Sequence, residues 1–389
     1  MNVRQPFSRR RFVGGVAAAV GAMGLRPDAE LFAQGQTQQF TGGDAEYDAY
    51  VKLASNENNW GPPDSVMKAM NNAWKYANRY GYPDGNVNQV IAEHHGVRRD
   101  NILLTAGSGE GLNVMATTYL KPGLKVIGVS PSYASVFQQA ANVKADSIQL
   151  PLTKDYRQDI GQLVEVTNRY AREIGFVYLC NPNNPTGAVV TAKEVKQLLD
   201  GIPKDMPVLI DEAYHHYVDD PAYGTAIPYV TEGRPVVVAR TFSKAHGMAG
   251  MRTGYVLGMP ETIKKLNDWE GASYLNVPGL IAAAVSIKDQ ARLDAEKALN
   301  PEARQFTVDW FKARGCEPTD SQCNFIFVNV NQPVRSFREA CRKEGVLVAR
   351  DFPPYEKSHC RISIGTLEEM KQATEVFGRA LAAAPAKAA

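Results

Sequence analysis

One lysine of the sequence is surrounded by residues that can bind an anion. Lys244 directly follows Ser243, lies three residues after Thr241 and precedes Arg252 by eight residues. Hydroxyl groups and a guanidinium donate the hydrogen bonds that hold a phosphate dianion. Nearby positive charge also lowers the pKa of a lysine, so that more of its amine is an uncharged nucleophile. The spacing therefore predicts a phosphate pocket that contains a reactive amine.

A glycine-rich turn offers further donors for the same phosphate. Gly107, Ser108 and Gly109 come directly before a helix that is predicted to start near Glu110. Backbone N–H groups at the beginning of a helix carry a partial positive charge, which favours bound anions. A phosphate pocket with a reactive amine indicates pyridoxal 5′-phosphate (PLP) as the cofactor.

Two more polar segments each follow an apolar run. Residues 181–187 read Asn-Pro-Asn-Asn-Pro-Thr-Gly after the run 176–179, and residues 211–214 read Asp-Glu-Ala-Tyr after the run 208–210. In open α/β sheets, ligands bind beyond the carboxyl ends of the strands. We therefore expect both segments to face a ligand.

Strand-like and helical patterns alternate over the first two thirds of the chain. Strands are predicted at 101–105, 125–129, 175–180, 208–210 and 235–239. Helices are predicted at 110–119, 191–199 and 261–269. This alternation favours an α/β fold, with a mainly parallel sheet that has helices on both faces. After residue 285, a long helix and the segments 324–330, 337–344 and 360–364 indicate a smaller α+β domain.

The same patterns set the expected domain boundaries. The large domain is predicted at 76–284, and the small domain is predicted to combine 50–75 with 285–379. A signal peptide is expected at 1–33, a linker at 34–49 and a disordered tail at 380–389, where Ala, Pro and Lys predominate.

Composition excludes several other classes of protein. The 389 residues are 44% hydrophobic and 22% charged, as in ordinary globular proteins. Because 43 Lys and Arg face 41 Asp and Glu, the chain has no strong positive field, and no nucleic-acid partner is expected. Five cysteines without a C-x-x-C pair are too few for a disulfide scaffold.

Two adjacent histidine pairs raise the question of a metal site. His94-His95 and His215-His216 lack partners at helical i, i+4 spacing. Neighbouring side chains on a helix or strand point in different directions, so we expect no metal site. The sequence also contains no P-loop motif.

The amino terminus has the pattern of an export signal. Residues 8–13 read Ser-Arg-Arg-Arg-Phe-Val, and a Gly/Ala-rich apolar run follows at 13–25. The paired arginines resemble a twin-arginine signal. The apolar run of 13 residues is shorter than the roughly 20 that a membrane helix needs, so no permanent membrane anchor is expected. Cleavage near Ala33 would release a periplasmic or otherwise exported protein, whereas a non-functional leader would leave it cytoplasmic.

Taken together, the motifs resemble those of the fold-type I, PLP-dependent class I/II aminotransferases. Residues 50–375 are similar to the histidinol-phosphate aminotransferase branch. The motifs that carry this resemblance are Ser-Asn-Glu-Asn at 55–58, Tyr-Pro-Asp at 82–84, Gly-Ser-Gly-Glu at 107–110, Pro-Ser-Tyr at 131–133 and Arg-Ile-Ser-Ile-Gly-Thr at 361–366.

The resemblance implies a role for each cofactor-binding residue. Lys244 would form the Schiff base with PLP and would later move the proton, while Asp211 would keep the pyridine nitrogen charged. Tyr214 and Asn184 would bind the cofactor hydroxyl, and Tyr133 would stack on the ring. The phosphate would be held by Arg252, Thr241, Ser243, Ser108, Gly109 and Glu110, and across a dimer interface by Tyr82.

The resemblance also implies a reaction and a substrate class. Arg361 would bind the substrate carboxylate, and Asn56 would lie near the substrate. The chain would transfer an amino group between an amino acid and a 2-oxo acid by a ping-pong mechanism, as a homodimer. Asn59 replaces the usual proline of the branch, and Gly85 follows Tyr-Pro-Asp, which bears on substrate choice. Because export would separate the enzyme from cytosolic phosphorylated intermediates, we expect a free amino acid or peptide-like amine as substrate.

Other reactions at the same cofactor stay open. A PLP-dependent lyase that performs β-elimination, or another enzyme that modifies amino acids outside the cytoplasm, would use the same Lys244 and Asp211. A cofactor-sensing regulator is disfavoured, because residues 1–50 contain no DNA-binding pattern.

Overall fold

The structure, a computed structural model, describes residues 43–269 and 274–382. The chain divides into two compact units, Met1–Tyr47 and Asp48–Ala389. In the first unit the described residues are 43–47, which lie in or next to the five-residue helix α3 (Asp44–Asp48). The predicted signal peptide at 1–33 lies outside the described residues.

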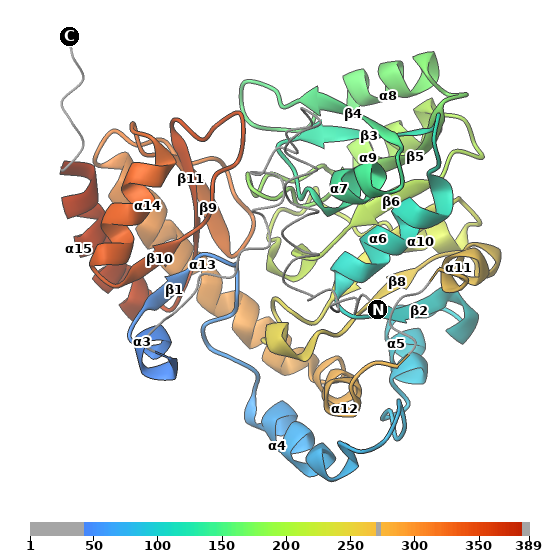
Figure 1. Cartoon of the computed structure of the whole chain (residues 1–389), viewed down its shortest axis with the longest axis horizontal. Coiled ribbons are helices and arrows are strands. Elements are labelled where there is room, and N and C mark those ends of the chain that lie inside the picture. Colours follow the sequence, from blue (N-terminus) through green and yellow to red (C-terminus); the bar gives the residue numbers. More distant parts are fainter. Residues whose placement is uncertain (1–42, 270–273, 383–389) are drawn as a thin grey trace, which may run out of the picture. The chain divides into compact units, whose positions relative to one another are not determined.

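A seven-stranded sheet forms the centre of the second unit (Figure 1). Its strand order is β2-β8-β7-β6-β5-β3-β4, and all neighbours are parallel except β8, which is antiparallel to both β2 and β7. The strands are β2 (Ile102–Thr105), β3 (Lys125–Ser130), β4 (Asp146–Pro151), β5 (Ile174–Cys180), β6 (Val208–Asp211), β7 (Val236–Thr241) and β8 (Gly254–Leu257). The five predicted strands are thus confirmed to within two residues at each end, whereas β4 and β8 were not predicted.

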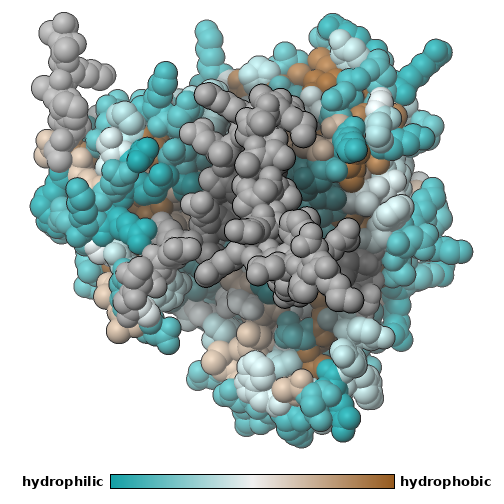
Figure 2. Space-filling model, viewed as in Figure 1, coloured by the Kyte–Doolittle hydropathy of each residue, from teal (hydrophilic) through white to brown (hydrophobic). Residues whose placement is uncertain are grey.

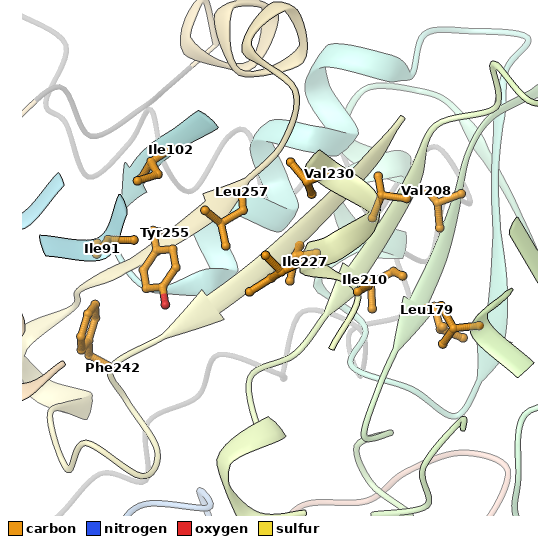
Figure 3. Packing of buried hydrophobic residues seen from close by; sticks show 14 of the residues in the cluster. Ile91, Ile102, Leu179, Val208, Ile210, Ile227, Val230, Phe242, Tyr255 and Leu257 are labelled. Atoms are coloured by element: carbon orange, nitrogen blue, oxygen red, sulfur yellow. The ribbon is translucent and has the colours of Figure 1, made fainter. Parts of the chain in front are cut away.

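Alternate residues of the strands enter two different cores, as the period of two in a strand requires. In β6, Val208 and Ile210 pack into one hydrophobic cluster, while Leu209 between them packs into the other. In β5, Leu179 belongs to the first cluster and Tyr178 to the second. Figure 3 shows the first cluster, with Leu179, Val208 and Ile210 close to one another. A sheet buried on both faces follows, which confirms the predicted α/β class.

Helices cover both faces of the sheet. The face of Leu209 is packed by α6 (Ser108–Tyr119), α7 (Ser135–Asn142) and α11 (Pro260–Asn267). The face of Val208 is packed by α4 (Asp64–Ala73), α5 (Val87–His95), α8 (Ile160–Arg169), α9 (Ala192–Gly201), α10 (Ile227–Thr231) and α12 (Val277–Ser286). The 3-10 helices are η2 (Trp74–Tyr76), η3 (Arg99–Asn101), η4 (His215–Tyr217) and η5 (Ala249–Met251).

A separate core is built from the chain's last third and one early strand. β1 (Val51–Leu53) pairs in parallel with β10 (Val346–Val348), and β9 (Phe325–Asn329) pairs antiparallel with β11 (His359–Ser363). The helices α13 (Gln290–Lys312), α14 (Val334–Lys343) and α15 (Leu367–Ala382) pack on these strands. This arrangement corresponds to the predicted smaller α+β part.

Three segments differ from the predicted organisation. Val66 and Met70 of α4 pack into the large core, whereas Val51 and Leu53 pack into the small one, so residues 50–75 are shared between the two cores. Helix α3 lies inside the predicted linker. Helix α15 continues through the start of the predicted tail, because Ala380 is buried in the small core.

The surface of the described residues is mainly hydrophilic in the view of Figure 2. No helix within the described part of the chain combines the length and the apolar character that crossing a bilayer requires. All five cysteines are buried and unpaired.

Candidate active site

The polar segments singled out in the sequence meet at one edge of the seven-stranded sheet. β2, β3, β5, β6 and β7 run in the same direction, so their carboxyl ends share this edge. A cavity of about 360 Å³ lies there. Ten of the predicted site residues line it, namely Ser108, Gly109, Tyr133, Asn184, Asp211, Tyr214, Thr241, Ser243, Lys244 and Arg252.

The amine of Lys244 is held inside this cavity, three residues beyond the end of β7. Its Nζ donates a hydrogen bond to the carbonyl oxygen of Ser55 over 2.9 Å and lies 5.6 Å from the centre of the Tyr214 ring. Burial lowers the pKa of Lys244 to about 8, and the positive charge of Arg361 adds to this effect. A larger fraction of the amine is therefore uncharged near neutral pH than in an exposed lysine, as a nucleophile requires.

Asp211, the last residue of β6, is a buried carboxylate without an ion-pair partner among the described residues. Its Oδ1 accepts a hydrogen bond from the N–H of Ala213 over 3.2 Å. Burial raises the pKa of Asp211 to about 7. A protonated pyridine nitrogen placed at this carboxylate would supply the missing positive charge, so the residue fits PLP.

A buried ion pair fixes the strand ends on which Asp211 and Thr241 lie. Arg240 precedes Thr241, and Glu212 follows Asp211. The Nε and Nη2 atoms of Arg240 donate to Oε2 of Glu212 over 2.9 and 2.6 Å, and Oε1 accepts from the N–H of Ala226. Both side chains are buried. The pair therefore holds the ends of β6 and β7 in register below the cavity.

A cluster of donors suited to phosphate lies next to Arg252. Nη1 of Arg252 is 3.4 Å from Oγ of Ser243, whose backbone N–H donates to Oγ1 of Thr241. Nη2 donates to the carbonyl oxygen of Ala106 over 3.1 Å. Gly107 has φ of 79°, and a Cβ at this residue would lie 2.6 Å from Nη2 of Arg252. A side chain here would push the guanidinium aside, and the positive φ itself favours glycine, so Gly107 keeps Arg252 in a position that fits the phosphate of PLP.

Helix α6 begins at Ser108, two residues earlier than the sequence predicted. The positive φ of Gly107 ends the preceding turn and allows the helix to start there. Ser108 and Gly109 therefore lie in the first helical turn, where backbone N–H groups have no partner within the helix. These donors face the cavity together with Arg252.

Tyr214 is held by two asparagines from distant parts of the sequence. Nδ2 of Asn56 donates to the Tyr214 hydroxyl over 3.0 Å, and Nδ2 of Asn184 lies 3.4 Å from the same oxygen. Asn56 is itself fixed, because its N–H donates to Oγ of Ser363. Burial raises the pKa of Tyr214, so its hydroxyl keeps its proton and can donate it in a hydrogen bond.

Arg361, on β11, is hydrogen-bonded to Asn184, which lines the cavity. Nη1 donates to Oδ1 of Asn184 over 2.8 Å, and Nη2 donates to the carbonyl oxygen of Ala54. Its buried Nε has no partner among the described residues. Burial lowers the pKa of Arg361 to about 10, which leaves it charged at neutral pH. A buried guanidinium with an unused donor is suited to a carboxylate.

Four predicted residues are absent from the cavity lining. Arg361 and Asn56 are hydrogen-bonded to the lining residues Asn184 and Tyr214, respectively. The other two are Glu110 and Tyr82. The side chain of Glu110 turns back and accepts a hydrogen bond from the N–H of Ala106 over 2.6 Å, while its own N–H donates to the carbonyl of Gly107. The side chain of Glu110 therefore supports the turn, and its predicted role at the phosphate stays a prediction. Tyr82 is 74% exposed and is absent from the cavity lining, and its predicted reach into a partner subunit stays a prediction.

Three groups near the cavity were not singled out in the sequence. The carbonyl of Ser55 binds Lys244, and the carboxylate of Glu57 lines the cavity. Both residues lie in the Ser-Asn-Glu-Asn motif at 55–58, and this motif could have identified them as site residues. Arg350 lies over the ring of Phe352, as does Arg361, and no motif marked it.

The histidine pairs are closer together than the sequence predicted. The rings of His215 and His216 have centroids 3.7 Å apart, and that of His246 lies 4.9 Å from His216. The rings of His94 and His95 also contact each other, at 4.6 Å. The expectation that adjacent rings point apart is therefore wrong. Across residues 43–269 and 274–382, no group of three His, Cys, Asp or Glu side chains is arranged to hold a metal ion.

Comparison with known proteins assigns the chain to a family. Residues 48–377 match the family model of aminotransferase class I and II. A histidinol-phosphate aminotransferase of Moorella thermoacetica is 33% identical over 337 residues, which cover 85% of this chain and 84% of that protein. One from Caldicellulosiruptor saccharolyticus is 31% identical, covering 84% of this chain and 92% of that protein.

A solved structure supports the same relationship. Histidinol-phosphate aminotransferase from Sinorhizobium meliloti, in complex with pyridoxal-5′-phosphate, superposes with a TM-score of 0.80 and 25% identity, covering 90% of this chain and 97% of that one. The chain is a member of the class I and II aminotransferase family, with the fold of the PLP-dependent enzymes of fold type I.

Proposed function

We propose that the protein is a PLP-dependent aminotransferase that exchanges an amino group between an amino acid and a 2-oxo acid in two half-reactions. The observation that carries this proposal is the Lys244 amine, with its lowered pKa, in one cavity with an unpaired Asp211 carboxylate and the Arg252 cradle. Family membership and the PLP complex of the Sinorhizobium meliloti relative support the same cofactor here.

Different residues of the cavity would bind different parts of PLP. Arg252, Ser243, Thr241 and the first turn of α6 would bind the phosphate, and Asp211 would hold the ring nitrogen in its protonated form. Tyr214 and Asn184 would bind the ring hydroxyl, and Tyr133 would cover the ring. When bound, the cofactor supplies an aldehyde carbon and a ring that withdraws electrons.

Lys244 would act twice. Its uncharged amine would first attach the cofactor, and once a substrate amine has displaced it, it would carry the proton from the substrate α-carbon. The carbonyl of Ser55 gives the released amine a fixed acceptor at 2.9 Å. Arg361 binds the carbonyl of Ala54 and Lys244 binds that of the adjacent Ser55, so a carboxylate bound at Arg361 would place the α-carbon near this amine.

A half-reaction screen tests the proposal. The purified protein, loaded with PLP, is mixed with one amino acid at a time, and its absorbance spectrum is followed for conversion of the cofactor to its pyridoxamine form. Histidinol phosphate belongs in the panel because it is named in the relatives' activity. Conversion by at least one donor is expected. Release of ammonia and pyruvate without a 2-oxo acid acceptor would indicate elimination instead.

We also propose that the enzyme is a homodimer in which Tyr82 reaches the partner's phosphate. Large aromatic side chains that stay exposed in the described chain support this: Trp74 is 55%, Tyr80 is 84% and Tyr274 is 68% exposed. The rings of Tyr80 and Tyr274 are 5.3 Å apart, so they form one aromatic surface. Sedimentation should give twice the mass of the purified chain, which is 42.6 kDa with the leader included, and Tyr82→Phe should weaken PLP binding.

Export is proposed from the leader alone. Arg9 and Arg10 lie in the stretch that resembles a twin-arginine signal. Cell fractionation should find the protein in the periplasm, and replacing both arginines by lysine should keep it in the cytoplasm. An unchanged distribution would remove the export proposal and the restriction to free amino acids or peptide-like amines that follows from it.

A further inference from the structure

A tyrosine in a loop of the large sheet is hydrogen-bonded to the strand that carries Arg361. The Tyr156 hydroxyl lies 2.9 Å from Nε2 of His359, although the two residues are 203 positions apart in the chain. Tyr156 lies in the loop between β4 and α8, and His359 is the first residue of β11. The contact therefore joins the large sheet's layer of loops to the small core.

The Tyr156 backbone adopts a conformation that glycine adopts more easily than residues with a side chain. Its φ is 63°, in the left-handed region, which costs of order 1 kcal/mol or more for a residue with a side chain. The surrounding loop is firmly anchored to the large core. Nε2 of Gln158 donates to the carbonyl of Cys180 at the end of β5, and Arg157 pairs with Glu194 over 3.1 Å. The loop thus presents Tyr156 from a fixed base.

The small core receives Tyr156 in an aromatic pocket. Its ring lies 5.7 Å from that of Tyr355 and 5.1 Å from that of His359. The other ring nitrogen of His359, Nδ1, is 2.8 Å from Oγ of Ser358, so both nitrogens have partners. Burial lowers the pKa of His359 to about 4, which keeps the ring neutral and able to donate at one nitrogen and accept at the other.

His359 and Arg361 lie on the same face of β11. Alternate residues of a strand share a face, so His359, Arg361 and Ser363 project together. Each binds a residue outside its own strand pair: Tyr156, Asn184 and Asn56 respectively. His359 and Arg361 are about 7 Å apart along the strand, so a shift of β11 at His359 moves the Arg361 guanidinium as well.

We propose that Tyr156 is a positioning residue, which through His359 holds β11 so that Arg361 meets the substrate carboxylate. The inference rests on the proposed role of Arg361. A bidentate guanidinium–carboxylate pair depends on the orientation of both planar groups, so a small displacement of the strand weakens it. The strained backbone of Tyr156 is kept because the anchored loop and the aromatic pocket fix it from both sides.

The test compares two analogues of one amino acid, of which one keeps the carboxylate and the other lacks it. The best amino-acid donor of the half-reaction screen defines both: the matching carboxylic acid without the amino group, and the matching amine without the carboxylate. Their dissociation constants are measured with the PLP-loaded enzyme. Tyr156→Phe is expected to raise the dissociation constant of the acid about threefold to tenfold, which is the effect expected from the loss of one hydrogen bond. The constant for the amine and the affinity for PLP should stay unchanged.

Tyr355→Phe is the matched control, because it removes a hydroxyl from the same aromatic pocket and no described residue is hydrogen-bonded to that hydroxyl. Tyr355→Phe should leave the dissociation constants of both probes unchanged. His359→Leu should reproduce the effect of Tyr156→Phe, whereas His359→Gln should keep most of the affinity for the acid. The double variant Tyr156→Phe/His359→Leu should bind the acid no more weakly than either single variant.

The outcomes separate this inference from the proposed function. If Arg361→Lys weakens the acid while Tyr156→Phe and His359→Leu do not, the positioning role is overturned and the role of Arg361 stands. If Tyr156→Phe weakens acid and amine equally, Tyr156 has only a structural role. If Arg361→Lys leaves the acid's affinity unchanged, the proposed carboxylate site and the positioning role both fail.

Discussion

The guanidinium of Arg361 donates a hydrogen bond to the side-chain oxygen of Asn184 over 2.8 Å, which joins the predicted carboxylate binder to a predicted cofactor binder. The two residues come from different cores, β11 on one side and the loop after β5 on the other. In the proposed mechanism, this one contact couples the site for the substrate carboxylate to the site for PLP.

Replacing Arg361 tests this coupling. Each hydrogen bond to a charged group is worth about 1.5–3 kcal/mol, so we expect Arg361→Ala to lower kcat/KM for amino acids by roughly tenfold to more than a hundredfold. Steady-state kinetics measure the change. Arg335→Ala is the control, because Arg335 is exposed and pairs only with Glu339 on its own helix. Equal kinetics for the two variants would remove Arg361 from the site.

The buried carboxylate of Asp211 should destabilise the cofactor-free protein. Burial raises its pKa from 3.8 to about 7 in the folded state. Between these values the folded protein binds a proton that the unfolded chain releases, so stability falls as the pH rises from about 4 to 7 and stays low above. Each pKa unit is worth about 1.4 kcal/mol. Asp211→Asn should therefore stabilise the cofactor-free protein at pH 8 by up to a few kcal/mol.

The same substitution should abolish most of the activity, because a neutral amide cannot keep the ring nitrogen charged. Urea denaturation of the cofactor-free protein measures the stability, and the half-reaction measures the activity. A variant that is both less stable at pH 8 and fully active would contradict the assignment of Asp211.

Gly107 should be essential for the phosphate cradle. A Cβ there would lie 2.6 Å from Nη2 of Arg252, and φ of 79° is unfavourable for alanine. Gly107→Ala should displace the guanidinium and raise the dissociation constant for PLP at least tenfold, as measured by equilibrium dialysis. Gly123→Ala is the control: its φ of 93° is also positive, but nothing lies within 4 Å of a Cβ there. Similar PLP affinity in both variants would argue against the cradle.

The buried histidines should make the protein sensitive to acid. Burial lowers the pKa of His246 from 6.5 to about 3, and the charge of Arg240 acts in the same direction. Above pH 6.5 neither state binds the proton. Between pH 6.5 and 3 the unfolded chain binds it and the folded protein does not, so stability is lost on acidification by about 1.4 kcal/mol per pH unit for this histidine.

Denaturation with urea at pH 7.5 and 5.5, in one cofactor state, measures this loss. His246→Phe should reduce the difference between the two pH values, since a phenyl ring cannot be protonated and Phe242 already lies 4.7 Å from this ring. His94→Gln should reduce it as well, because burial also lowers the pKa of His94. A pH dependence that is unaltered in His246→Phe would show that other groups cause the acid sensitivity.

The parts of the site that follow strands could be predicted from the sequence. Asp211, Lys244 and Asn184 lie within a few residues of buried strand ends, where local pattern and sheet geometry decide their place. The hydrogen bond from the Ala106 N–H to the Glu110 side chain could not be predicted, because the motif does not show that this side chain turns back onto the preceding turn. The Tyr156–His359 contact and the clustering of His216 with His246 depend on long-range packing, which periodicity does not encode.

Covalent attachment of PLP to Lys244 is the most direct test of the account. The PLP-loaded enzyme is reduced with borohydride and digested, and the peptide that contains residue 244 is examined by mass spectrometry. We predict that this peptide carries the mass of the reduced cofactor, that Lys244→Ala carries none and that Lys264→Ala, at a lysine on the separate helix α11, carries it as the unaltered enzyme does. An unmodified Lys244 peptide from active enzyme, or transamination by Lys244→Ala, would contradict the proposed mechanism.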